Sequence, residues 1–107
     1  MNQRNETPED KRSHFEKEMA PISFQELQKF FARGLLITTA THLDLVEVAL
    51  AVHADDTEQI QRWLQQGDLV RAHDDHAKKW VAERAVLMAV TVAPWVLVQE
   101  TPSEGVQ

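Results

Sequence analysis

An apolar run near the end of the chain constrains the fold more than any other feature. It covers residues 86–98 and reads Val-Leu-Met-Ala-Val-Thr-Val-Ala-Pro-Trp-Val-Leu-Val. So many β-branched residues in succession favour a strand over a helix. Pro94 has no backbone N–H to donate to a neighbouring strand, so it marks an edge, a bulge or a bend. The run therefore predicts a β-sheet, but it does not by itself indicate an activity.

Composition divides the 107 residues into three parts. Residues 1–20 are charged and poor in apolar side chains, so we expect a mobile arm with helix near its end. Residues 21–100 have the patterning of a small single domain of the α+β class. Residues 101–107 offer nothing to pack, and we expect a disordered tail there.

The hydrophobic periods within residues 21–100 predict the order helix, strand, helix, helix, strand, helix, strand, with about three strands. The helices are expected at about 23–33, 43–54, 57–66 and 74–84, and the strands at 35–39, 69–72 and 86–98. The helix at 43–54 is apolar over most of its circumference and should be central, although its valines leave strand as an alternative. This order is winged-helix-like, and residues 57–66 would then form the recognition helix.

Charge and composition narrow the classes of partner. The formal net charge is −6, and residues 21–107 carry seven basic against twelve acidic side chains. An acidic domain has no general attraction for nucleic acid, whose binding depends on cationic contacts to phosphate. The chain has no cysteine, which excludes disulfides and zinc sites built on thiolates. Its start is polar and its apolar runs are short, so we expect a cytoplasmic protein that does not bind membranes.

Two strings in the sequence resemble those of a known family. They are Leu-Asp-Leu-Val-Glu-Val at residues 43–48 and Pro-Trp-Val-Leu-Val-Gln at residues 94–99. With them, the chain resembles the bacterial domain of unknown function 2288 family over about residues 34–100. The resemblance implies a bacterial cytosolic protein. It implies no activity, cofactor or catalytic residue.

The string His73-Asp74-Asp75-His76 has the ligand types that a divalent metal ion prefers. A site built on His73, Asp75 and His76 is one hypothesis. The alternative is a solvated helix start, since carboxylates at a helix N-terminus interact favourably with the helix dipole.

The helix expected at 57–66 carries three side chains that can hydrogen-bond base edges, namely Gln59, Arg62 and Gln65. Contacts to phosphate need several lysines or arginines, and this helix has only Arg62. A polar helix surface without a ligand is the alternative, and nucleic acid is an unfavoured partner.

The three tryptophans differ in their setting. Trp63 and Trp80 fall on the inner faces of expected helices, and Ala77 and Val81 are expected to face inward beside Trp80. Trp95 follows Pro94 at the interruption of the final strand. There it is either a core residue or an exposed anchor, because tryptophan is enriched among interface hot spots. A strand edge beside Pro94 and Trp95 could then pair with a protein partner or with a second copy.

These observations favour a non-catalytic protein-interaction or regulatory module over an enzyme. The chain has only three glycines, no phosphate-binding loop and no serine at a glycine-flanked elbow, so we assign no catalytic residue and no cofactor. A winged-helix nucleic-acid-binding protein and a small metal-dependent enzyme are the alternatives. The partner, the oligomeric state and the strand order are left open by the sequence.

Overall fold

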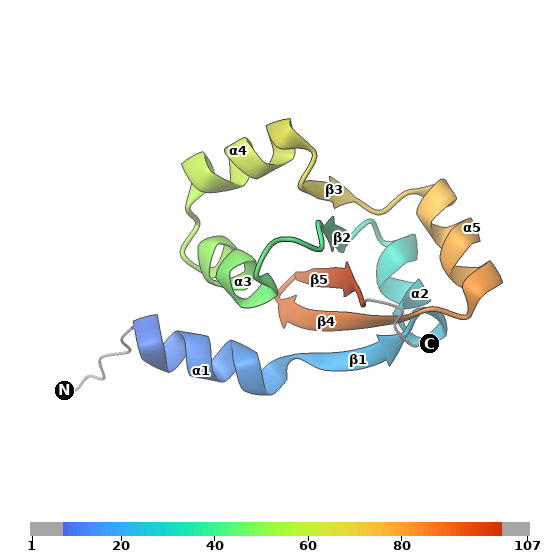
Figure 1. Ribbon diagram of the computed structural model, residues 1–107, viewed down its shortest axis with the longest axis horizontal. Helices are drawn as coiled ribbons and strands as arrows, with labels where there is room; N and C mark the ends of the chain where they lie inside the picture. Colours follow the sequence, from blue (N-terminus) through green and yellow to red (C-terminus); the bar gives the residue numbers. More distant parts are fainter. Residues whose placement is uncertain (1–7, 102–107) are drawn as a thin grey trace.

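The computed structural model describes residues 8–101, which form five helices and five strands (Figure 1). The helices are α1 (Pro8–Glu18), α2 (Phe24–Ala32), α3 (Leu45–His53), α4 (Thr57–Gln66) and α5 (Asp74–Glu83). The strands are β1 (Ala20–Ser23), β2 (Leu36–Thr39), β3 (Leu69–Arg71), β4 (Val86–Val92) and β5 (Trp95–Glu100). The α+β class is confirmed, but the chain has five strands where about three were expected. No helix in the described part is long and apolar enough to cross a lipid bilayer.

All five strands belong to one mixed sheet in the order β1-β4-β5-β2-β3. β4 and β5 pair as an antiparallel hairpin, and β5 also pairs parallel with β2. β1 and β3 are the two edges, where each pairs antiparallel with its single neighbour. The final strand therefore lies inside the sheet, and the expectation that it offers an open edge to another chain is wrong. Its backbone hydrogen-bonding groups are already used on both sides.

Two of the strands account for the difference in strand number. The apolar run at 86–98 forms two strands, and Pro94 lies in the turn where Val92 pairs with Trp95. A residue without a backbone N–H suits that turn, so the interruption was predicted but the hairpin was not. β1 is four residues long and carries Pro21, which made it hard to predict as a strand. At an edge of the sheet, a proline is tolerated.

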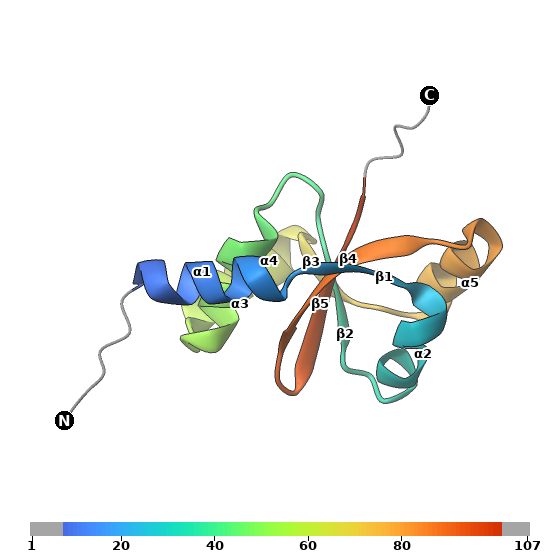
Figure 2. The same cartoon turned by 90° about the horizontal axis from the view of Figure 1, so that it is seen from below.

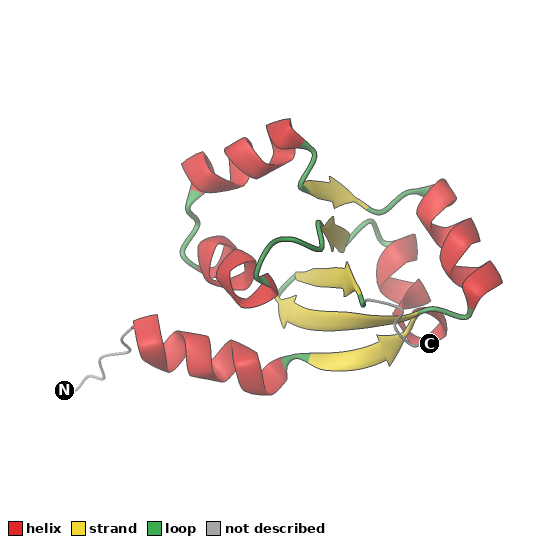
Figure 3. Cartoon of the chain, viewed as in Figure 1, coloured by secondary structure: helices red, strands yellow, loops and turns green. Residues whose placement is uncertain are grey.

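Helices cover both faces of the sheet, and alternate residues of β4 show the division. Leu87 and Ala89 pack into a cluster with α2 and α5. Val90 and Val92 pack into a second cluster with α1, α3 and α4. Figures 2 and 3 show α1, α3 and α4 gathered at one end of the molecule and α2 and α5 at the other. This five-strand sheet between two helical clusters does not match the winged-helix architecture that the element order suggested.

Helix α1 belongs to the folded part of the chain, although residues 1–20 were expected to form a mobile arm. Phe15 is buried against α3, and its ring lies 5.8 Å from that of His53. Arg12 donates a hydrogen bond to Asp44 at the start of α3. One buried aromatic side chain in a charged segment is a weak sequence signal, but it docks the helix. Residues 1–7 of the expected arm, and 102–107 of the expected tail, lie outside the described residues.

The central helix α3 is confirmed as a helix, which settles the choice between helix and strand at 43–54. Asp44 is its N-cap and accepts the backbone N–H of Val46 at 3.0 Å. Val48 and Ala49 are completely buried. The following helix α4 ends at Gln66, and its C-cap is Gly67, whose φ of 78° is the left-handed conformation that glycine adopts at low cost.

Candidate functional site

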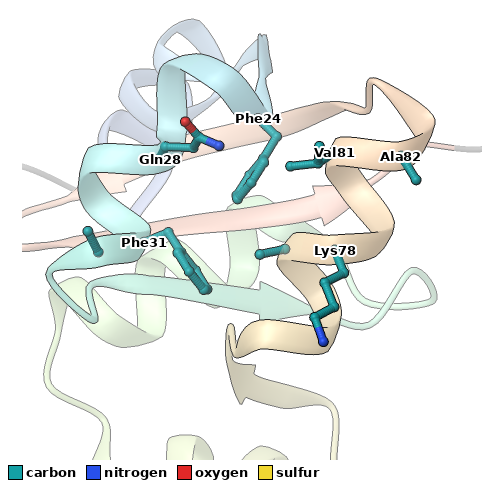
Figure 4. Close-up of a pocket in the computed structure, with 8 residues that line it drawn as sticks. Phe24, Gln28, Phe31, Lys78, Val81 and Ala82 are labelled. Atoms are coloured by element: carbon teal, nitrogen blue, oxygen red, sulfur yellow. The ribbon is translucent and has the colours of Figure 1, made fainter.

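An apolar groove runs between α2 and α5 (Figure 4). Its central part has a volume of about 580 Å³. The residues that line it are Phe24, Gln28, Phe31, Ala32, Ala77, Lys78, Val81 and Ala82. Figure 4 shows the rings of Phe24 and Phe31 directed from α2 toward α5, with Val81 facing them. Carbon atoms therefore form most of the groove wall.

Trp80 forms the support beneath this groove. Its side chain is 1% exposed, and its ring centroid lies 5.3 Å from that of Phe24. The burial of Trp63 and Trp80 confirms the prediction that both belong to the core. Because Trp80 is directed into the core, the next residue along α5, Val81, is turned about 100° around the helix.

Val81 was expected to face inward, and the structure places it differently. Its side chain is 56% exposed at the mouth of the groove. Of the three residues in this stripe, Trp80 is buried, Ala77 is partly buried and Val81 is exposed. The result is an exposed branched apolar residue beside two phenylalanine rings.

The groove continues at both ends of α5. At the N-terminal end, a hollow that shares Phe31 and Ala32 is lined by His73, Asp74 and Asp75. At the C-terminal end, a hollow that shares Phe24 and Val81 includes Arg84. Carboxylates therefore flank one end of the groove and a guanidinium group flanks the other.

The two histidines at the N-terminal end cap α5. The backbone N–H of His73 donates to Nδ1 of His76 at 3.0 Å, and the backbone N–H of Asp75 donates to Nδ1 of His73 at 3.3 Å. These bonds make a capping box that uses one ring nitrogen of each histidine. The described residues contain no group of three or more side chains placed to hold a metal ion, so His73, Asp75 and His76 are not brought together as ligands.

The surroundings of His76 favour its neutral form. Burial lowers the pKa of His76 below its usual value, and the neighbouring ring of His73, 4.1 Å away, acts in the same direction. The ring also stacks on Trp80 at 5.4 Å. An imidazole that accepts a hydrogen bond on Nδ1 loses that bond when the nitrogen takes up a proton. We therefore expect acid to weaken the cap at the start of α5.

Glu100 fixes the other side of α5 to the sheet. The indole N–H of Trp80 donates to it at 3.0 Å and lowers its pKa, against the opposing effect of burial. The ammonium group of Lys79 lies 3.1 Å from the same carboxylate oxygen and lowers the pKa further. These two contacts to Glu100, which we call the tether, link α5 to β5. They do not use the side of α5 that faces the groove.

The predicted partner-binding residues, Pro94 and Trp95, lie in the hairpin turn and not in the groove. Pro94 is exposed, whereas Trp95 is half-buried. The guanidinium group of Arg71, from edge strand β3, lies 5.6 Å from the Trp95 ring centroid. One face of the indole is thus already occupied by a cation within the chain.

The predicted nucleic-acid-binding residues lie together on α4, as their spacing required. Arg62 donates to Oε1 of Gln59 at 2.7 Å, and Gln65 is exposed one turn further on. Asp56 caps this helix and Glu58 lies in its first turn. The helix therefore presents acidic groups beside its one arginine, which opposes the approach of a phosphate backbone.

Sequence reasoning missed the groove as a site. Phe24 and Phe31 lie seven residues apart on α2, and Ala77 and Val81 lie four apart on α5, so each pair shares one face of its helix. That signal was available, but it is also typical of core residues. Only the packing of α2 beside α5 leaves these faces partly open.

Comparison with known proteins places the chain in a family. A solution NMR structure, that of PA1075 from Pseudomonas aeruginosa, is similar to it with a TM-score of 0.77 and 41% sequence identity. The similarity covers 100% of this chain and 96% of that one. A search of curated proteins gives no match. Over residues 10–100 the sequence matches the family described as protein of unknown function (DUF2288). With most of its length matched, the chain belongs to the DUF2288 family.

Proposed function

We propose that this chain is a non-catalytic protein-interaction module whose α2–α5 groove binds an amphipathic helix. The apolar wall that the exposed Val81 and the partly buried Phe31 form at the groove carries this proposal. A helix that docks in such a groove supplies apolar side chains at positions i, i+3 or i+4, and i+7. Water leaves the apolar walls on binding, and this burial is the main favourable contribution to affinity.

The charges at the two ends of the groove favour one orientation of the bound helix. Asp74 and Asp75 lie at one end, and Arg84 lies at the other. A helix antiparallel to α5 begins near Arg84 and ends near Asp74. Helices generally carry acidic residues in the first turn and basic residues in the last turn. A partner with this common polarity meets an opposite charge at each end.

The residues along the groove support binding over catalysis. Ser23, near the C-terminal end of α5, accepts the backbone N–H of Glu26 as the N-cap of α2. His73 lies at the opposite end of the groove, and its Nδ1 is used in the α5 cap. A hydroxyl and an imidazole at opposite ends do not make a nucleophile and base pair.

The groove is a better partner site than the hairpin turn at Pro94 and Trp95. The turn is formed by a strand that lies inside the sheet, and Trp95 is in contact with Arg71. Binding there would have to displace that cation, whereas the groove offers apolar surface that no described residue covers.

The test uses a synthetic helical peptide of about 14 residues, long enough for three anchor positions. It carries acidic residues in its first turn, basic residues in its last turn and leucines at i, i+3 or i+4, and i+7. Added to the 15N-labelled full chain, it is expected to shift the backbone amide signals of α2 and α5. A peptide of the same composition with the charges exchanged is expected to bind more weakly.

Two matched variants give the control. Val81→Asp is expected to weaken peptide binding about tenfold or more, because it places a charge in the apolar wall. Leu64→Asp changes a similarly exposed helical residue, 46% accessible on α4, and should leave binding unchanged. Absence of any amide shift at about 1 mM peptide, or shifts confined to other elements, would overturn the proposal.

A further inference from the structure

A helix that fits the charge pattern of the groove is present in this chain, namely α5 itself. Asp74 and Asp75 lie in its first turn, and Arg84 is its C-cap. Ala77 and Val81 form an apolar stripe between these charges on the groove side. α5 therefore has the polarity and the apolar face that an antiparallel partner helix needs.

Two antiparallel copies of α5 are complementary along the whole stripe. If a two-fold axis passes near residue 79, Ala77 of each copy faces Val81 of the other. Asp74 and Arg84 each lie five residues from that axis, which is about 7.5 Å along the helix. Each Asp74 carboxylate then meets the Arg84 guanidinium of the second copy. A two-fold contact uses the same patch on both copies, so a self-complementary patch is what it requires.

The remaining charges of α5 do not oppose this arrangement. Lys79 is held at 3.1 Å by Glu100. Lys79 and Glu83 line a hollow at the C-terminal end of α5 that includes Arg84 but neither Ala77 nor Val81. Lys78 extends in Figure 4 along α5 toward its N-terminal end and away from the middle of the helix. The centre of the apolar stripe therefore consists of Ala77 and Val81.

We infer that a second copy of this chain occupies the α2–α5 groove and that the protein forms a two-fold homodimer through antiparallel α5 helices. The inference rests on the proposed function, because it names the occupant of the same groove. In the dimer, α2 and α5 of both copies would form a four-helix layer that covers the phenylalanine rings.

The test reverses the charge at one end of α5 at a time and measures the mass of the protein by sedimentation equilibrium. The wild-type full chain is expected to give twice its chain mass of 12.2 kDa. Asp74→Lys and Arg84→Asp each create two like-charge contacts in a homodimer, and each variant should weaken dimerisation about tenfold. An equimolar mixture of the two variants restores both attractive contacts, so it should dimerise as well as the wild type. Val81→Asp should give a monomer, whereas Leu64→Asp should stay dimeric.

The outcomes separate this inference from the proposed function. A wild-type chain that stays monomeric at about 1 mM overturns the homodimer. The groove still stands as a helix-binding site if the synthetic peptide shifts α2 and α5 in that monomer. A dimer that is unaffected by Val81→Asp and by both charge changes has its interface elsewhere, which also overturns the inference. Failure of both the dimer and the peptide removes the proposed function as well.

Discussion

On one face of the sheet three helices share a core, whereas on the other face two helices stand on either side of a groove. α1, α3 and α4 bury Phe15, Val48 and Trp63 in the first cluster. α2 and α5 bury Leu27 and Trp80 in the second cluster, but they leave Val81 exposed. The difference is that α1 adds a third helix to the first cluster, and no described element does the same for the second.

This comparison teaches that the same amphipathic pattern can lead to a closed core or to an open groove. A third packed element removes apolar surface from water at about 25 cal/mol per Å². Where such an element is missing, the surface is available to another chain. Three changes test this contrast, from the largest expected effect to the smallest.

Removal of Phe15 would break the closed cluster. We expect Phe15→Ala to lower the free energy of unfolding by about 3 kcal/mol, because a buried aromatic ring is lost and a cavity remains. Urea denaturation measures the change, and Ser13→Ala, at an exposed residue of the same helix, is the control. A loss below about 0.5 kcal/mol would mean that α1 does not complete the first cluster, and the contrast between the two faces would fail.

The tether at Glu100 tests how α5 is held in place beside an open groove. Glu100→Gln keeps an acceptor for the Trp80 indole but loses the ion pair with Lys79 and the charge on the hydrogen bond. We expect a loss of about 1 kcal/mol at pH 7, modest because this carboxylate is partly exposed. Glu83→Gln, at an exposed acid on the same helix, should change stability less. Equal effects in urea denaturation would show that the tether does not stabilise α5.

Acid should weaken the groove side of the molecule through His76. The folded state lowers the pKa of this group below the usual 6.5, so the unfolded chain binds more protons between the two values. Stability is therefore fully present above about pH 6.5 and falls as the pH falls through the folded pKa. The lowered pKa values of Asp44 and Glu100 also remove stability on acidification, but at the more acidic pH where carboxylates titrate.

The measurement is the thermal midpoint between pH 7.5 and pH 5. His76→Gln keeps a side-chain acceptor at the third position of α5, as in an ordinary capping box, and it does not titrate. Its midpoint should fall less over this range than that of the wild type. Identical slopes for the two proteins would contradict the role assigned to His76.

Local patterns in the sequence predicted most of the elements. The caps and periodicity located α2, α3, α4 and α5, and the β-branched run located the C-terminal strands. β1 was missed because it has only four residues and includes Pro21. Such a short segment has little strand propensity of its own, and it becomes a strand only by pairing with β4. For a related reason, the structure does not bring the predicted metal ligands together. His73 and His76 have ligand chemistry, but their Nδ1 atoms are used by the backbone of the first turn.

The sequence by itself determined the α+β class, the central helix, the break at Pro94 and the acidic charge of the domain. These follow from propensities and periods that act over a few residues. Only the tertiary structure decided that β5 lies inside the sheet, that α1 joins the core through Phe15, and that Val81 faces outward. These depend on which distant segments meet. Strand order and helix packing are set by long-range contacts, and a pattern of apolar residues shows which face of an element is apolar but not what covers it.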